Sequence, residues 1–313
     1  MKQSRSQRRW RTKFRTRFII KHEWQLWLFV LPVVVFFLIF HYAPMYGLVI
    51  AFKRYSITRG IMESPWVGLM YFKRFFNSTM FWTLLRNTLV LSFYQLLVSF
   101  PFPIILALIL NHTRREKLKK LTQTVTYAPH FISLVVLTGM LYLFLSPSTG
   151  IINVILKKLG MPSVYFMGSE KWFRHLFVFS HVWQHTGYQA IIFLAALTAV
   201  DPTQYEAATI DGATKLQKIW YIDLPAIMPT VVTVLLLQVG RMMNVDTQKA
   251  LLMQTATNLS TSEIIGTYVY KIGLVDAQFS YSTAINLFQT IVNLLILVFV
   301  NQVSKRLTSE SLW

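Results

Sequence analysis

The sequence predicts an all-α integral membrane protein with six transmembrane helices. Of its 313 residues, 54% are hydrophobic and 14% are charged, whereas a soluble domain carries about 25% charged residues. Apolar segments of about 20 residues or more recur along the chain, each long enough to cross a hydrocarbon core as a helix. These segments are residues 26–45, 82–110, 124–145, 173–200, 228–252 and 281–303.

Basic residues flank the apolar segments and predict the boundaries of the membrane domain. Nine Lys or Arg lie in the first 21 residues, so residues 1–23 are predicted to be a basic cytoplasmic segment. No small-residue cleavage site follows the first apolar run, and we expect that run to remain as the first span. The six-span domain is then residues 24–303, and residues 304–313 form a cytoplasmic tail.

The same charges predict orientation in the cell membrane. Five Lys and Arg between Arg114 and Lys120 follow the second span, and the positive-inside rule places them in the cytoplasm. Six spans then leave both termini cytoplasmic. Basic residues also occur in the first outer loop, against this rule, at Lys53, Arg54, Arg59, Lys73 and Arg74. The net charge of +19 is typical of nucleic-acid binding as well, but its placement beside apolar spans favours membrane lipid and no nucleic acid.

The polar loop at residues 201–229, between the fourth and fifth spans, carries its own helix signals. Asp201 is a helix N-cap with Pro202 at the first helical position, and Gly212 permits a left-handed turn. A second capping pair, Thr214 and Gln217, begins another helix. Pro225 and Pro229 are predicted to end that helix. The loop is therefore a compact knob: helix, glycine turn, helix.

The residues of this knob resemble the EAA signature of permease subunits of ATP-binding-cassette (ABC) importers. Every fixed position of that signature is filled at the right spacing, by Glu206, Ala207, Ala208, Gly212, Ile222, Leu224 and Pro225. Residues 261–274, 278–284 and 301–306 resemble the carbohydrate-uptake branch, closest to the polysaccharide and complex-oligosaccharide permeases of Gram-positive bacteria. The resemblance implies the type I ABC importer permease fold.

The resemblance also implies a function and a set of partners. The chain would be the pathway subunit of an ATP-driven, binding-protein-dependent importer of oligosaccharides that works by alternating access. Its partners would be a second related permease (a paralogue or a second copy), two cytoplasmic ABC ATPases and an extracellular solute-binding lipoprotein. The knob would couple to an ATPase, with Glu206 facing a basic residue. The coupling residues implied are Glu206, Ala207, Ala208, Asp211, Gly212, Leu224 and Pro225; an ordinary amphipathic surface hairpin is the alternative.

The sequence gives no sign of chemistry in this chain. No Gly is followed by Lys, so the phosphate-binding loop of a nucleotidase is absent, and ATP and Mg are expected in the partner ATPase. No catalytic residue and no metal site is predicted, because His181 and His185 alone are too few ligands for zinc.

Polar residues inside apolar spans are the candidates for the substrate pathway, because such groups tend to face a cavity. They come from the fourth, fifth and sixth spans: Trp183, His185 and Tyr188; Gln238, Arg241 and Asn244; Asn286 and Gln289. The alternative for each is a hydrogen bond between helices. Arg241 and Asp246 also interrupt the fifth span.

Two other classes of protein are weighed against an importer subunit. A secondary transporter usually shows repeated halves with broken helices, and no such repeat is evident. A membrane-embedded enzyme needs a carboxylate or His cluster at a span end. Asp201, Glu206, Asp211 and Asp223 do cluster, but the EAA signature accounts for them.

Overall fold

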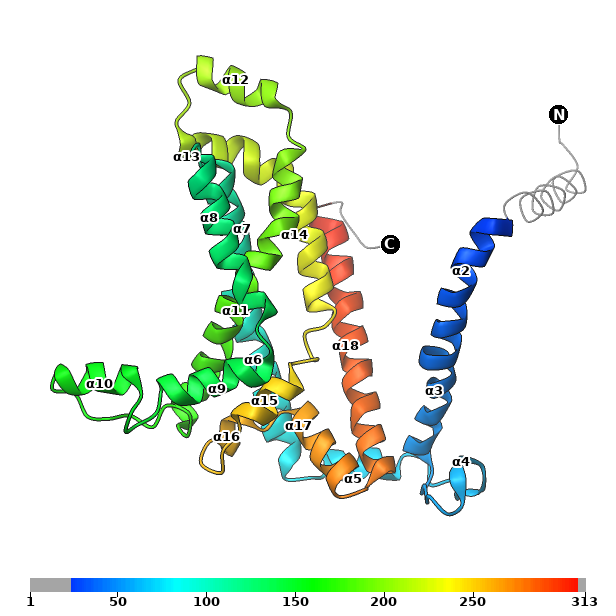
Figure 1. The fold of residues 1–313 in the computed structure, drawn as a ribbon. Helices are drawn as coiled ribbons and strands as arrows, with labels where there is room; N and C mark the ends of the chain where they lie inside the picture. Colours follow the sequence, from blue (N-terminus) through cyan, green and yellow to red (C-terminus); the bar gives the residue numbers. More distant parts are fainter. Residues whose placement is uncertain (1–23, 309–313) are drawn as a thin grey trace, which may run out of the picture. The chain divides into compact units, whose positions relative to one another are not determined.

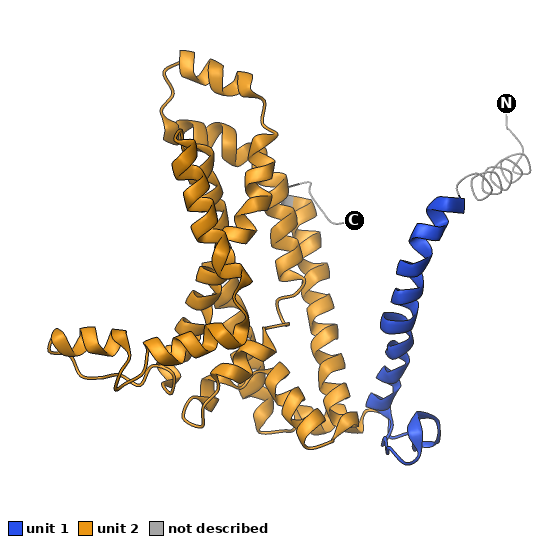
Figure 2. Ribbon diagram, in the orientation of Figure 1, with its two compact units in different colours: residues 1–68 blue, residues 69–313 orange. Residues whose placement is uncertain are grey.

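The computed structural model describes residues 24–308, and every regular element in this range is a helix (Figure 1). The predicted basic segment 1–23 and residues 309–313 of the predicted tail lie outside the described residues. The described part divides into two units, residues 1–68 and 69–313 (Figure 2). The all-helical class predicted from the sequence is confirmed.

The first unit is a long helical rod followed by a short loop. The rod runs through α2 (Trp24–Phe37), η1 (Leu38–Tyr42), α3 (Ala43–Met45) and η2 (Tyr46–Phe52). It is 29 residues long, and none of its most apolar stretch is buried within the chain. An unburied helix that is apolar all round requires lipid or another protein around it. The loop contains α4 (Gly60–Glu63), and the Lys53 ammonium donates to the carbonyls of Ile61 and Met62 at 2.9 Å.

The second unit contains the remaining helices. In chain order they are α5 (Met70–Phe76), α6 (Met80–Ser99), α7 (Pro101–Asn111), α8 (Glu116–Tyr127), η3 (Ala128–Phe131), α9 (Leu134–Phe144), α10 (Ile151–Lys158), α11 (Glu170–Thr198), α12 (Pro202–Ile210), α13 (Lys215–Lys218), η4 (Ile219–Asp223), α14 (Leu224–Val239), α15 (Thr247–Met253), α16 (Leu259–Ser262), α17 (Ile265–Tyr270), η5 (Lys271–Val275) and α18 (Phe279–Thr308). Figure 1 shows α12 and α13 at one end of this unit and α5, α16 and α17 at the other.

Four helices in the described range are long and apolar enough to cross a membrane: Trp24–Phe52, Met80–Asn111, Lys215–Val239 and Phe279–Arg306. A bent pair, Glu116–Phe131 with Leu134–Phe144, makes a fifth if it is counted as one span. The fourth predicted span lies in α11, which has 29 residues but carries charged and polar side chains such as Arg174, His181 and His185. All six predicted segments therefore contain helix, although the count of six spans is not established by length and composition.

Two predicted spans are not single straight helices. In the third, the axis bends by 100° between Phe131 and Leu134. Pro129 lies in the 3-10 turn η3, and Ser133 is extended and caps α9 by accepting a hydrogen bond from the Val136 amide. The prediction of one continuous span over 124–145 was wrong because these two residues end one helix and begin another.

The fifth predicted span, 228–252, is also broken. Helix α14 ends at Val239 and α15 begins at Thr247, so residues 240–246 are irregular; we call them the break. Asp246 is the N-cap of α15 and accepts from the Lys249 amide at 3.0 Å. Irregular backbone at membrane depth is tolerated where it is buried in protein or lines a cavity, so the surroundings of the break decide its role.

The predicted end of the knob at Pro225 and Pro229 was wrong as well. The chain is helical without interruption from Lys215 to Val239. Pro225 lies in the first turn of α14, and the wide π turn η4 stands immediately before it. A proline inside an α-helix clashes with the carbonyl four residues earlier, and the wider turn relieves that crowding. The knob is thus joined to α14 by a continuous helix.

Buried apolar side chains hold α7, α11 and α14 together, including Ala107, Phe193 and Ile227. Helix α11 also approaches α8 closely at Gly187, where an added β-carbon would collide with the backbone of Thr126. Small residues at such crossings let helix backbones pack tightly in membranes. The long helices therefore form a packed frame between the knob and the opposite end of the unit.

Candidate functional site

The knob, residues 201–223, is fixed by local hydrogen bonds. The Asp201 carboxylate accepts from the Thr203 amide at 2.9 Å, and this bond holds its pKa below the usual value. Gly212 has φ +74°, which is the left-handed turn predicted from the sequence. Thr214 and Gln217 form a complete capping box. The predicted helix, glycine turn and helix are all confirmed.

The knob exposes large apolar side chains. Ile210 is 87% exposed, Tyr221 79%, Leu216 70% and Trp220 66%. Exposed apolar groups of this kind are typical of a surface that contacts another protein or the membrane. Of the residues implied by the EAA signature, Ala208 and Leu224 are half-buried, and the others are exposed: Glu206, Ala207, Asp211, Gly212 and Pro225.

A buried carboxylate ties the knob to the frame. Asp223 is fully buried; it accepts from the Tyr205 hydroxyl of α12, and its Oδ2 lies 2.5 Å from Nε2 of His112. Asn111 also donates to it, at 3.4 Å. We call Asp223, Tyr205, Asn111 and His112 the clamp. Burial and the bond to Asp223 raise the pKa of Tyr205 to about 12, so this hydroxyl keeps its proton and remains a donor.

Sequence reasoning missed the role of the clamp. Asp223 was noticed only as one of four acids that the signature explains. The signal was present as a pair of polar residues, Asn111 and His112, at the end of the second apolar segment. Because these residues are more than 100 positions from Asp223, no local pattern joins them.

A polar cavity lies where the break meets α6 and α11. Its volume is about 300 Å³. The polar lining comes from three helices and the break: Ser92, Gln95 and Ser99 of α6, His181 and Gln189 of α11, Gln238 of α14, and Arg241 and Asn244 of the break. We call this space the polar cavity. It brings together three of the predicted pathway residues, Gln238, Arg241 and Asn244.

A neighbouring cavity of about 490 Å³ includes Asn244, Asn286 and Gln289 in its lining. Gln289 nevertheless uses its amide to hold the break, donating to the Met243 carbonyl at 2.6 Å and to Asn244 Oδ1 at 3.2 Å. Asn293, one turn further along α18, donates to the Gly240 carbonyl at 2.5 Å and accepts from the Met243 amide at 3.1 Å. Asn293 was not predicted; two side chains of α18 thus define the shape of the break.

The other predicted pathway residues, Trp183, His185 and Tyr188, line neither of these cavities. Tyr188 stacks on the ring of His130 with 3.9 Å between ring centroids, and His185 Nδ1 lies 3.1 Å from Nδ1 of His130. Trp183 is half exposed. The structure therefore places His185 and Tyr188 against η3, away from Arg241.

The fold and site together describe a membrane component with a polar interior and a docking knob. A family model described as "Binding-protein-dependent transport system inner membrane component" matches residues 86–309. The match covers well over half of the chain, and the chain belongs to this family. It is therefore an integral membrane protein and a component of a transport system rather than an enzyme.

Named relatives lie within the same family. The chain is 42% identical over 301 residues to the polygalacturonan/rhamnogalacturonan transport system permease protein YteP of Bacillus subtilis (strain 168), covering 96% of this chain and 94% of that protein. It is 40% identical over 294 residues to Protein LplB of the same organism, covering 94% and 92%. A chain from the crystal structure of a bacterial ABC transporter that imports the acidic polysaccharide alginate superimposes with a TM-score of 0.87, at 39% identity, covering 94% of this chain and 99% of that chain. The predicted permease fold is confirmed.

Proposed function

We propose that the chain forms part of the membrane pathway of an ATP-driven importer that takes up oligosaccharides from an extracellular binding protein. Its relatives are named for the transport of polygalacturonan, rhamnogalacturonan and alginate. A second solved structure, with a TM-score of 0.86 and 38% identity, is the alginate transporter in complex with an alginate pentasaccharide-bound periplasmic protein. The polar cavity, lined by amide, hydroxyl and guanidinium groups, suits the hydroxyls of a sugar.

The observation that carries the proposal is the mechanical link between knob and cavity. An exposed apolar knob is clamped by a buried carboxylate and continues as one helix, Lys215–Val239, that ends at the break. Two cytoplasmic ATPases, which hold ATP and Mg, would bind the knobs of this subunit and of a second related permease. Closure of the ATPases would displace the knob, and the helix would carry that displacement to the wall of the polar cavity. This is alternating access driven from the knob.

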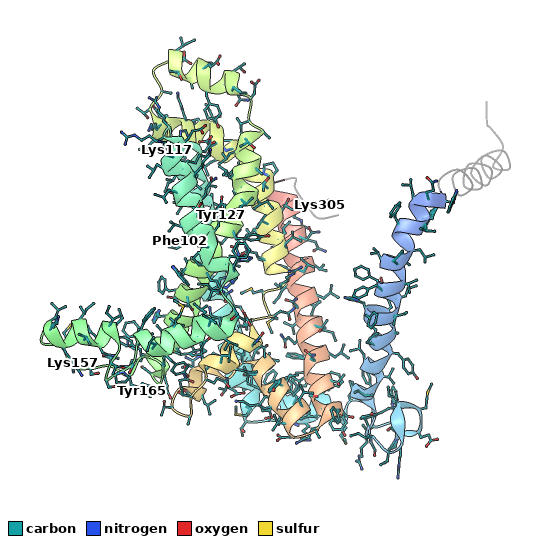
Figure 3. All side chains as sticks on the ribbon, viewed as in Figure 1. Phe102, Lys117, Tyr127, Lys157, Tyr165 and Lys305 are labelled. Carbon is teal, nitrogen blue, oxygen red and sulfur yellow. The ribbon has the colours of Figure 1, made fainter. Side chains whose placement is uncertain are left out.

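We propose that the knob and both termini face the cytoplasm. Lys117 and Lys305 lie in the half of the second unit that carries α12 (Figure 3), and Lys117 belongs to the basic cluster 114–120. Basic residues near span ends favour the cytoplasmic side. An ATPase in the cytoplasm can reach the knob only in this orientation.

Two measurements test the proposal. The chain contains no Cys, so Lys215→Cys in the knob gives a single label site; it is expected to react with an impermeant maleimide only after the membrane is opened. The tagged chain is expected to copurify with an ATPase and to support sugar uptake that requires ATP. Labelling from outside in intact cells contradicts the orientation. Uptake driven by an ion gradient with no ATPase present contradicts the importer and favours a secondary transporter.

A further inference from the structure

The polar cavity contains one permanently charged group and no acid. That group is the guanidinium of Arg241, in the break. In the described part of the chain, no carboxylate lies within ion-pair distance of its guanidinium, and no side-chain hydrogen bond holds it. The acid nearest in sequence, Asp246, accepts from the Lys249 backbone as the cap of α15. The Arg241 side chain is exposed in this chain and lines the polar cavity. Charged groups within a membrane domain tend to face a water-filled pathway, so this guanidinium is available to an anion that passes through the cavity.

A second cavity, at the end of this unit opposite the knob, is also lined by more basic than acidic side chains. It has a volume of about 410 Å³ between α6, α11 and α16, and its lining includes Lys171, Arg174 and His175, with Glu170 as its one acid. Arg174 donates to Asn87 Oδ1 at 2.9 Å, while its Nε finds no partner in the part of the chain that the structure describes. We call this space the outer cavity, in keeping with the proposed orientation.

The end of the second unit opposite the knob carries further basic residues, on the side of the membrane where the positive-inside rule predicts few of them in the proposed orientation. Lys73 lies on α5 at this end, and α10, with Lys157 labelled in Figure 3, also lies away from the knob. Arg74, beside Lys73, lies over the ring of Tyr281 at 4.2 Å. The orientation of a permease in the membrane does not require these cations, and they reduce the difference in basic residues between the two sides that sets that orientation. A role in binding explains them better than a role in orientation.

We propose that the transported solute is an anionic oligosaccharide whose sugar units carry carboxylates, and that Lys171 and Arg174, then Arg241, contact those carboxylates in turn. The inference rests on the proposed function, an oligosaccharide importer. A guanidinium binds a carboxylate through two parallel hydrogen bonds, and Gln95, Gln189 and Gln238 beside it are suited to the hydroxyls. Two cavities of one sign also concentrate an anion along its route. A neutral sugar would make no use of the charge of Arg241, which has no acid beside it in the polar cavity.

The alternative use of the basic outer end is to dock an acidic face of the binding protein. That explanation leaves Arg241 unexplained, because the polar cavity is lined by the interior helices and the break. The alternative use of Arg241 is an ion pair with the second permease. These two explanations predict losses that do not depend on the charge of the sugar, which separates them from the proposal.

The test uses the complete transporter in liposomes, with its binding protein outside and ATP inside. The probes are trigalacturonate and its carboxyl-reduced counterpart, a neutral galactotriose of the same length. Arg241→Gln is expected to lower trigalacturonate uptake at least about tenfold, as loss of one partner of a buried charge pair does. Uptake of the neutral trisaccharide relative to the unmodified transporter is expected to stay the same or rise. Arg241→Lys keeps the positive charge but cannot bind a carboxylate through two parallel hydrogen bonds. Its trigalacturonate uptake is expected to lie between that of the Gln variant and that of the unmodified transporter.

Matched variants keep the result interpretable. Arg306→Gln makes the same change at an exposed position in the last turn of α18 and is expected to leave uptake of both probes unchanged. Lys171→Gln, in the outer cavity, is expected to raise the KM for trigalacturonate alone, and it tests the proposal even if the Arg241 variants do not assemble. Equal losses for both probes, in either variant, overturn the proposal. If the unmodified transporter takes up neutral oligosaccharides but no acidic one, the inference fails and the proposed function stands. If it takes up no oligosaccharide, the proposed function itself fails.

Discussion

The knob and the break lie at the two ends of one helix and are built in opposite ways. The hydrogen bonds within the knob join residues at most 18 positions apart, as from Thr203 to Asp201 and from Tyr205 to Asp223. Asp223, at the base of the knob, is also held by Asn111 of α7. The hydrogen bonds that shape the break come from α18, where Gln289 and Asn293 lie 46 and 53 positions from the carbonyls they bind. A locally determined element keeps its shape when its surroundings move, whereas one held from another helix changes when the two helices separate. The knob is therefore suited to receive a displacement, and the break to respond to it.

The largest effect is expected where the knob meets the frame. Asp223→Ala removes the acceptor of Tyr205 and the partner of His112 inside the protein. Each buried donor left without its acceptor costs about 1–3 kcal/mol, and Asp223 has three such partners. ATP-driven uptake is expected to be lost, and the thermal unfolding temperature of the purified complex is expected to fall.

Asp276→Ala is the control, because Asp276 is an exposed acid outside the knob. Exposed substitutions usually change the free energy of unfolding by less than about 0.5 kcal/mol. If both variants have the same unfolding temperature and uptake, the clamp does not join the knob to the frame.

A smaller effect is expected inside the knob. Gly212→Val forces a β-branched residue into the left-handed conformation, at a cost of roughly 1–2 kcal/mol. The knob is expected to lose its fit to the ATPase, so that ATPase stimulation falls while membrane insertion is unaffected. Gly212→Asn is expected to retain more activity, since Asn tolerates this conformation better. Unchanged uptake in the Val variant would remove the glycine turn from the mechanism.

The smallest effect on stability is expected at the break. Asn293→Ala removes two hydrogen bonds, each contributing about 1 kcal/mol, and leaves the Gly240 carbonyl and Met243 amide without that partner. We expect the break to become more mobile, so that a Cys at Met242 reacts faster with a water-soluble maleimide. Thr290→Ala serves as the control, because the Thr290 hydroxyl bonds only within its own helix. Equal labelling rates in the two variants would show that α18 does not shape the break.

The contrast between these regions also explains what could be predicted from the sequence. Caps and a glycine turn depend on neighbouring residues, so Asp201, Gly212 and Thr214 were predicted correctly. The π turn before Pro225 lets the helix continue past a proline, and no residue pattern specifies such a turn. The predicted helix end there was therefore wrong. The bonds from Asn111 and His112 to Asp223 join residues 112 and 111 positions apart. The bonds from α18 to the break join residues 45 or more positions apart. Polar residues in the spans could be recognised, but not which of them share one cavity.

The uninterrupted helix from Lys215 to Val239 has a consequence for how such a subunit can vary. At 1.5 Å and about 100° per residue, its 25 residues make a rod of about 37 Å in which the azimuth of the knob is set by residue count. Inserting one residue into α14 would turn the knob by about 100° relative to the polar cavity. The knob would then no longer face the surface of the ATPase that it binds. Insertions in the irregular residues 240–246 carry no such rotation. Changes of length are therefore expected to be excluded from the rod.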